Sequence, residues 1–319
     1  MELVVFLVSL FGFLALGIPI AIVLVLCSMV LMYYGGMWDS MFVMIIPQSM
    51  LDGANNYPLM AIPFFVFAGE IMTEGGLSKR VVKLAQLIIG RVRGGLGYAA
   101  IVSSVIFAGL MGSSVGEAAA LGSLLLPMMA QAGYKPGRAG GVIASGAILG
   151  PIIPPSITLI VYASITNVSV SQLFMGSVIP GILLAGSLIV YALVYGKRKN
   201  LPAHEKQTPK QIGHAFKEGI WALLMPIIIL GGIFGGIFTP TEAAAVAVVY
   251  ALIISLTVYR DMKLSELPQV FVEASVSTAT IMMMVGLSKA SSYVVVTSGL
   301  PQQLLDVFTS ITSNRIVIL

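Results

Sequence analysis

Residues 96–132, LGYAAIVSSVIFAGLMGSSVGEAAALGSLLLPMMAQA, decide how this chain folds. They are mainly apolar and are interrupted near the middle by a polar break, Gly112–Glu117. The apolar arm on each side is shorter than the roughly 20 residues that a helix needs to cross the hydrocarbon core of a bilayer. We therefore expect a re-entrant hairpin, in which two half-helices enter and leave the membrane by the same face. Non-helical backbone is tolerated at that depth only where it is buried in protein or lines a wet cavity.

A second break interrupts the apolar run 139–166 at GPIIPPS, residues 150–156. Its three prolines remove three backbone N–H donors and stop any helix. This run is therefore expected to form two half-helices around an unwound centre.

Apolar residues dominate the whole chain. Of 319 residues, 58% are hydrophobic and only 9% are charged, against about 25% charged in an ordinary soluble domain. A water-soluble globule of this size cannot bury so much apolar surface, so the composition excludes one. The single cysteine, Cys27, builds no disulfide framework. What remains is an all-α polytopic membrane protein.

Seven apolar segments are read as crossings: residues 3–34, 57–76, 139–166, 175–199, 220–238, 241–259 and 276–297. The first is too long for a signal peptide and follows Glu2, so we interpret it as one membrane helix with a bend at Gly17 and Pro19. Residues 40–56 contain Pro47 and Asp52 and do not fit a simple crossing.

The basic residues orient these segments. Residues 78–93 mix Lys and Arg with Val, Leu and Ile, which is typical of an amphipathic helix in the membrane interface. With the N-terminus in the cytoplasm, every Lys and Arg except Lys289 and Arg315 falls on the cytoplasmic side, as the positive-inside rule requires. The basic residues therefore orient the chain and form no nucleic-acid-binding stripe.

Two similarities indicate an internal repeat. Pro19 resembles Pro240 in its surroundings, and Gly76-Leu77 resembles Gly299-Leu300, so both pairs have a similar offset. Five crossings between the copies make the second copy inverted, which is the signature of secondary transporters. We expect a first repeat at 1–199, a cytoplasmic linker at 200–219 and a second repeat at 220–319. The first repeat comprises scaffold helices 1–76, an interfacial helix 78–93, the hairpin 96–132, the broken helix 139–166 and a helix 175–199. The second repeat is incomplete because its hairpin would lie beyond residue 319.

The two breaks carry the candidate chemistry. Ser113 and Ser114 begin a half-helix, where the positive helix end suits an anion and the hydroxyls and carbonyls suit a small cation. In the alternative interpretation, Ser114 and Glu117 form a capping box, which leaves Ser113 freer to bind. Carbonyl oxygens freed at Gly150–Ser156 suit Na⁺, and Ser156 either ligates the ion or caps the next half-helix. The alternative here is a purely structural proline kink.

The motifs of the sequence give little support to an enzymatic function. His204-Glu205 lacks the second histidine of a metalloprotease motif, and no phosphate-binding Gly-x-x-x-x-Gly-Lys-Ser/Thr occurs. Thr239–Glu242 reads as a structural capping box. Lys289 lies within an apolar helix, and whether it attracts an anion or pairs with a carboxylate stays open.

Three motifs in order carry a resemblance to a known family: FAGLMGSSVGEAAA at 107–120, GPIIPPS at 150–156 and FTPTEAAA at 238–245. Together they resemble the large, DctM-like membrane subunit of tripartite ATP-independent periplasmic (TRAP) transporters over the whole chain. Members of that family are longer, so the resemblance also implies a C-terminally truncated chain without the second hairpin.

The resemblance implies an elevator-type, Na⁺-coupled importer of organic acids in the bacterial inner membrane, with no cofactor other than the coupling Na⁺. A periplasmic substrate-binding protein would deliver the substrate, and a small four-helix membrane subunit would pack alongside in the lipid bilayer. By position, the expected cation-binding residues are Ser113, Ser114, Gly150, Pro154 and Ser156. The expected substrate-binding residues are Ser113, Gly116, Pro155 and Thr158.

Two other functions stay open on the sequence. A stand-alone secondary anion carrier would need no binding protein, and a membrane scaffold or receptor subunit would transport nothing. The sequence does not choose among C4-dicarboxylates, sialic acid and sugar acids as substrate.

Overall fold

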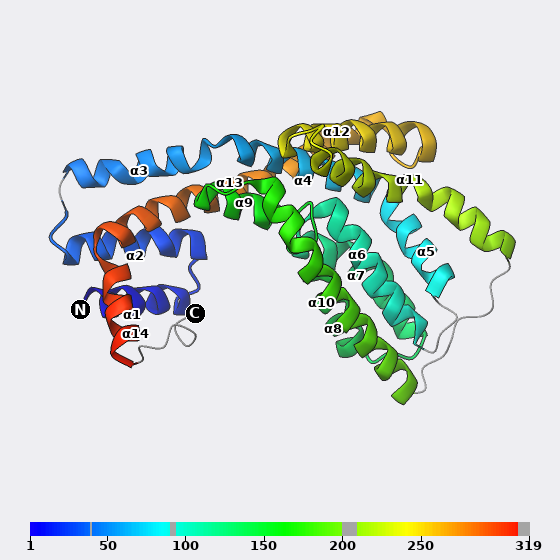
Figure 1. Cartoon of the computed structure of the whole chain (residues 1–319), viewed down its shortest axis with the longest axis horizontal. Coiled ribbons are helices and arrows are strands. Elements are labelled where there is room, and N and C mark those ends of the chain that lie inside the picture. Colours follow the sequence, from blue (N-terminus) through cyan, green and yellow to red (C-terminus); the bar gives the residue numbers. More distant parts are fainter. Residues whose placement is uncertain (39, 90–93, 200–208, 312–319) are drawn as a thin grey trace. The chain divides into compact units, whose positions relative to one another are not determined.

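The computed structural model describes residues 1–38, 40–89, 94–199 and 209–311, and this part of the chain consists of helices joined by short turns (Figure 1). The helices of its first half are α1 (Glu2–Ala15), α2 (Ile20–Tyr34), α3 (Ser40–Ala54), η1 (Tyr57–Met60), α4 (Ala61–Glu74), α5 (Leu77–Ile89), α6 (Gly95–Met111) and α7 (Ser114–Gln131). Those of its second half are α8 (Pro136–Ala147), α9 (Ile157–Thr166), α10 (Val170–Arg198), α11 (Pro209–Phe234), α12 (Pro240–Ile253), η2 (Ile254–Tyr259), η3 (Leu264–Glu266), α13 (Leu267–Thr297) and α14 (Leu300–Ile311).

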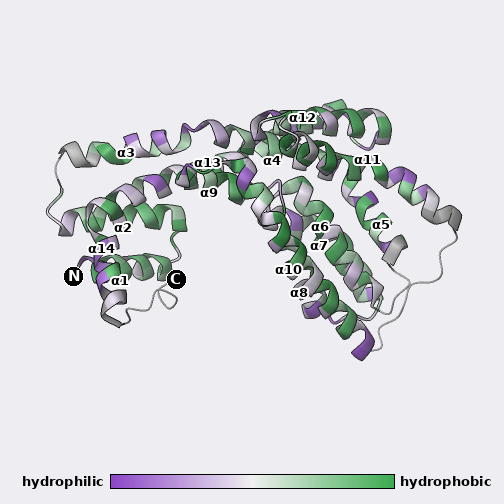
Figure 2. Cartoon of the chain, viewed as in Figure 1, coloured by the Kyte–Doolittle hydropathy of each residue, from purple (hydrophilic) through white to green (hydrophobic). Residues whose placement is uncertain are grey.

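Four helices in the described part are long and apolar enough to cross a membrane, namely α10, α11 from Gly213, α12 with η2, and η3 with α13. A fifth is added if α4 and α5, which meet at an angle of 68°, count as one bent span. Figure 2 shows that α10 and α12 consist predominantly of hydrophobic residues. The chain is therefore a multi-pass membrane protein, as its composition predicts.

The interpretation of residues 3–34 as one membrane helix is wrong. The run forms two helices, α1 and α2, which pack against each other. Gly17 ends the first in a left-handed conformation with φ of +78°. Pro19 then precedes α2 as its N-cap residue, with φ of −57° and ψ of 136°, outside the helical conformation. Apolar composition alone did not reveal this turn.

Other predicted boundaries shift by a few residues. The crossing predicted at 220–238 belongs to α11, which begins at Pro209, so the polar segment expected as a linker is helical from that residue onward. Residues 200–208 of the linker lie outside the described part. Within residues 40–56, Ser40–Ala54 form helix α3, which contains Pro47.

The amphipathic helix predicted at 78–93 is α5, and its last residues, 90–93, are not among those described. Val81 and Leu84 are buried, whereas Lys83 is exposed. The basic side chains pair with acids of other segments: Arg80 Nη1 lies 2.5 Å from Asp261 Oδ2, and Lys83 Nζ lies 3.0 Å from Glu218 Oε2. These pairs fix the polar edge of α5.

The chain divides into two compact units. The first unit comprises residues 1–56 and 279–319. Its described core joins α2, α3 and α13 through residues such as Leu31, Ile46 and Ala290. The buried hydroxyl of Ser28 donates to Ser291 Oγ at 2.9 Å, so one polar contact ties α2 to α13.

The second unit comprises residues 57–278 and holds both predicted breaks. Helix α4 packs along α12, and α6, α7 and α8 pack against one another. Phe67 of α4 meets Phe271 of α13 edge to face, with ring centroids 5.6 Å apart. This packing supports the hairpin and the broken helix described below.

The two Gly-Leu pairs that indicated a repeat have the same local geometry. Gly76 ends the turn after α4 with φ of +73°, and Leu77 begins α5. Gly299 ends the turn after α13 with φ of +74°, and Leu300 begins α14. The inverted repeat itself stays a prediction, since two matching turns do not establish it.

A glycine contact in the first unit gives a stability prediction. A Cβ built on Gly53 of α3 would lie 2.6 Å from Lys289 Cβ of α13, whereas one built on Gly12 of α1 would meet nothing within 4 Å. We expect Gly53→Ala to destabilise the protein by about 1–3 kcal/mol. Gly12→Ala should be neutral or slightly stabilising, because alanine favours a helix over glycine. Thermal unfolding in detergent measures both, and equal melting temperatures would contradict this packing.

Candidate functional site

The tip of the predicted hairpin is a turn of two residues between α6 and α7. Gly112 is left-handed, with φ of +59°, and Ser113 is extended. The break is thus shorter than the predicted Gly112–Glu117, since α7 begins at Ser114. The two helices pack against each other as the arms of a hairpin.

The capping interpretation of this tip needs a correction. Ser113 is the N-cap of α7, and its Oγ accepts a hydrogen bond from Gly116 N at 3.4 Å. Ser114 is the first helical residue, so the box predicted from Ser114 and Glu117 does not form. Because Ser113 performs the capping, it is not the freer of the two hydroxyls.

The break in the second predicted crossing separates α8 from α9 across residues 148–156. Ser156 caps α9: its Oγ accepts from Leu159 N at 3.3 Å and donates to the Pro151 carbonyl at 2.7 Å. The carbonyl oxygens of Gly150, Pro154 and Pro155 receive no hydrogen bond within the part of the chain that the structure describes. These are the free backbone oxygens that the proline pattern predicted.

The hairpin tip and the break are in direct contact. Ile157 N, at the start of α9, donates to the Gly112 carbonyl at 3.3 Å. A Cβ on Gly112 would lie 2.7 Å from the Pro155 oxygen, and a Cβ on Gly150 would lie 3.2 Å from the carbonyl carbon of Ser113. Only glycine allows this approach of the two backbones. The starts of α7 and α9 therefore meet at one place.

The structure gathers most of the expected site residues at this contact. Ser113 and Ser114 are half-buried, whereas Gly150, Pro154, Pro155 and Ser156 are buried. Gly116 lies in the first turn of α7, where its N–H is used by the Ser113 cap. Thr158 lies in the first turn of α9 and is exposed.

Glu117 is a site feature that the sequence reasoning missed. Its side chain is completely buried, and neither carboxyl oxygen has a hydrogen-bond partner within the described residues. A Cβ on Gly150 would lie 2.9 Å from Glu117 Oε2, so the carboxyl packs directly against the break. The Ser104 hydroxyl of α6 lies near the carboxyl and is likewise buried without a hydrogen-bond partner within the described residues. An isolated buried carboxylate is costly, so this group calls for a counter-ion or a proton.

The capping box predicted at Thr239–Glu242 is confirmed. Thr239 N donates to Glu242 Oε2 at 2.8 Å, and Glu242 N donates to Thr239 Oγ1 at 3.3 Å. Glu242 is exposed and has a structural role at the start of α12.

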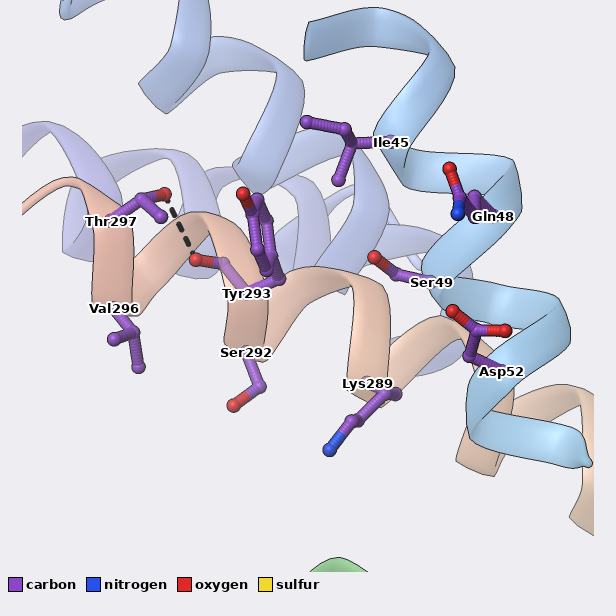
Figure 3. Close-up of a pocket in the computed structure, with 9 residues that line it drawn as sticks. All are labelled: Ile45, Gln48, Ser49, Asp52, Lys289, Ser292, Tyr293, Val296 and Thr297. Carbon is purple, nitrogen blue, oxygen red and sulfur yellow. Dashed lines mark hydrogen bonds between the residues drawn. The ribbon is translucent and has the colours of Figure 1, made fainter. Parts of the chain in front are cut away.

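Lys289 lines a pocket of about 530 Å³ in the first unit, between α3 and α13 (Figure 3). Asp52 lines the same pocket, but the ammonium group of Lys289 points away from its carboxylate. No ion pair joins the two side chains. The pocket therefore presents charges of both signs.

Broken helices that meet at their non-helical centres, in a multi-pass membrane protein, are features of secondary transporters. The sequence comparisons identify the family. Residues 7–319 match the family described as "Tripartite ATP-independent periplasmic transporter, DctM component", and the chain belongs to this family. As that description states, it is one component of a tripartite transporter that does not use ATP.

Several relatives, named for different substrates, match most of the chain. The 2,3-diketo-L-gulonate TRAP transporter large permease protein of Escherichia coli K12 is 42% identical over 98% of this chain and 73% of its own length. The sialic acid TRAP transporter large permease protein of Vibrio cholerae is 35% identical over 98% of this chain and 73% of its own length. The C4-dicarboxylate TRAP transporter large permease protein of Pseudomonas aeruginosa is 40% identical over 80% of this chain and 60% of its own length.

The contact between the tip and the break predicts that alanine at two left-handed glycines destabilises the protein by different amounts. Gly133 has φ of +82° and nothing within 4 Å of an added Cβ, whereas Gly112 has φ of +59° and Pro155 close by. Gly133→Ala should cost about 1–2 kcal/mol of backbone strain. Gly112→Ala should cost about twice as much, because the clash adds to the strain. Comparison of melting temperatures in detergent checks this, and a Gly112→Ala variant as stable as Gly133→Ala would contradict the contact.

Proposed function

We propose that this chain is the translocating large subunit of a Na⁺-coupled importer of organic acids, supplied by a separate substrate-binding protein. The single observation that carries the proposal is the contact between the hairpin tip and the α8–α9 break. It combines free backbone oxygens with two helix starts, as a site for a cation and an anion requires. Family membership supports the same conclusion.

The cation is proposed to bind beside the break. A Na⁺ ion prefers oxygen ligands, and Gly150, Pro154 and Pro155 offer carbonyl oxygens that no protein donor occupies in the described part. Ser113 and Ser114 lie at the adjacent tip. The carboxylate of Glu117 would balance the charge of the ion, which accounts for an acid buried without a hydrogen bond.

The substrate anion is proposed to bind at the two helix starts. Helix α7 begins at Ser114 and α9 at Ile157, and the Gly112 carbonyl joins the two starts through Ile157 N. Helix N-termini carry positive partial charge and attract carboxylates. The relatives are named for C4-dicarboxylate, sialic acid and diketogulonate, all of which are organic acids.

The family description supports a proposal for the partners and the location. We propose that a periplasmic binding protein and a small four-helix membrane subunit complete the tripartite assembly in the bacterial inner membrane. The basic ends of α8 and α10 would face the cytoplasm. The cytoplasmic N-terminus stays a prediction, and the separation of α1 from α2 removes the crossing count on which it was based. The elevator movement stays a prediction as well.

The first functional test is uptake by the tripartite complex that contains this subunit, reconstituted in proteoliposomes. An inward Na⁺ gradient should raise the rate of organic-acid uptake at least tenfold over an equal K⁺ gradient. The binding protein should be required, since without it a stand-alone carrier would still transport. Equal uptake with the two cations would reject Na⁺ coupling.

Glu117 gives a sharper test with a matched control. Glu117→Gln keeps the shape of the side chain but removes its charge, so half-saturation by Na⁺ should shift to at least about tenfold higher concentration, the effect of losing roughly 1.4 kcal/mol of binding. Glu242→Gln changes an exposed acid in the first turn of another helix, and glutamine still completes a capping box. Uptake at increasing Na⁺ concentration compares the two. An unchanged Na⁺ dependence in Glu117→Gln would exclude its carboxylate from the cation site.

A further inference from the structure

A groove of about 470 Å³ runs between α8 and α10 in the second unit, away from the contact between the tip and the break. This volume lies in the usual range for small-molecule sites, about 300–1,000 Å³. Arg138 of α8 lines it together with Tyr191 and Tyr195 of α10. Ile101 and Leu188 add apolar surface. One end of the groove is thus basic and aromatic, and the remainder is apolar.

The guanidinium of Arg138 is held in place at this groove. Its Nη1 donates to Tyr195 Oη at 2.6 Å, and its central carbon lies 5.0 Å from the centroid of the Tyr195 ring. The Tyr195 ring in turn stacks on Tyr191, with centroids 6.2 Å apart. Arginine has five N–H donors in a planar fork that matches phosphate oxygens, so most of its donors remain for a ligand.

Within the described residues, no acidic side chain forms an ion pair with the basic residues around the groove. Five basic residues lie at the start of α8 or the end of α10: Lys135, Arg138, Lys197, Arg198 and Lys199. All five are exposed, and none forms an ion pair within the described chain. No Asp or Glu occurs in the sequence between Glu117 and Glu205. The pocket beside Lys289, in contrast, includes the acid Asp52.

The length of α10 places the groove near the lipid headgroups when this helix spans a bilayer. Helix α10 has 29 residues and is about 43 Å long, close to the roughly 40–45 Å thickness of a bilayer including its headgroup regions. The hydrophobic body of α10 ends in a hydrophilic tip (Figure 2). Tyr191, Tyr195 and the basic residues therefore lie where aromatic and cationic side chains anchor a membrane helix.

Glycines leave the α8 wall of the groove open. Gly137 and Gly141 line it one turn apart, and a Cβ on either would meet no atom within 4 Å. The apolar part can therefore accept a chain beside the helix. A bilayer supplies both required features in one molecule, an anionic phosphate and an acyl chain.

We propose that the α8–α10 groove is a binding site for an anionic phospholipid. Arg138 and Tyr195 bind the phosphate, and the four neighbouring lysines and arginines favour a headgroup with net negative charge. The first carbons of one acyl chain lie beside Gly137 and Gly141 of α8 and contact Ile101 and Leu188. The site is separate from the proposed transport site, so its test needs no transport activity.

Native mass spectrometry of the purified protein, titrated with lipids, tests whether the groove prefers an anionic headgroup. Phosphatidylglycerol should bind at least tenfold more tightly than phosphatidylcholine, and soluble glycerol 3-phosphate should bind far more weakly because it lacks the acyl chain. Arg138→Gln should weaken phosphatidylglycerol about fivefold, which is the contribution of one interfacial base. Lys79→Gln removes an exposed base of α5 outside the groove and should have little effect.

A second variant fills the groove instead of removing charge. Gly141→Leu projects into it, and it also replaces a helix glycine by a better helix former, so the protein should stay folded. We expect it to lose at least tenfold in phosphatidylglycerol affinity. Gly186→Leu is the control, because Gly186 lies on α10 outside the groove and has nothing within 4 Å of an added Cβ.

Three outcomes would overturn the proposal. The first is equal binding of phosphatidylglycerol and phosphatidylcholine. The second is phosphatidylglycerol affinity that neither Arg138→Gln nor Gly141→Leu changes. The third is a Gly141→Leu variant that keeps the lipid but loses a membrane partner subunit, which would make the groove a protein interface.

Discussion

The structure depends on one constraint, the need to satisfy backbone polar groups where water is scarce. Helices satisfy their own, but the turn at Gly112 and the break before Ile157 cannot. The two irregular segments lie against each other, and Ile157 N donates to the Gly112 carbonyl. The oxygens left over around Gly150 and Pro155 are therefore concentrated in one small region. The proposed cation site is a direct result of bringing two interruptions together.

The sequence predicted the interruptions well because their causes are local. Three prolines within five positions, at 151, 154 and 155, remove three backbone N–H donors and break the helix, and the left-handed Gly112 ends α6. The amphipathic α5 was likewise visible in its own residues. The separation of α1 from α2 was missed because one glycine and one proline in a long apolar run fit either a bend or a reversal. Only packing between the two helices decides it.

The candidate site was harder to predict because small shifts of register change the role of a side chain. Moving the N-cap of α7 from Ser114 to Ser113 turns Glu117 from a capping residue into a buried acid. Its neighbour Gly150 comes from another segment, and no spacing along the chain encodes that contact. The α8–α10 groove could not be predicted from the sequence for the same reason. Its basic residues were read only as orientation signals, whereas their arrangement around Arg138 and Tyr195 requires the folded helices.

The acid-free segment between Glu117 and Glu205 has an electrical consequence. Five cations gather at one end of α8 and α10, and no nearby anion on these helices compensates them. Moving one elementary charge through a membrane potential of 100 mV changes the free energy by about 2.3 kcal/mol. If this end of the two helices faces the cytoplasm, as we propose, a potential that is negative inside holds it at the inner surface. The proposed transport motion would then be limited to displacements that keep these charges out of the electric field across the hydrocarbon.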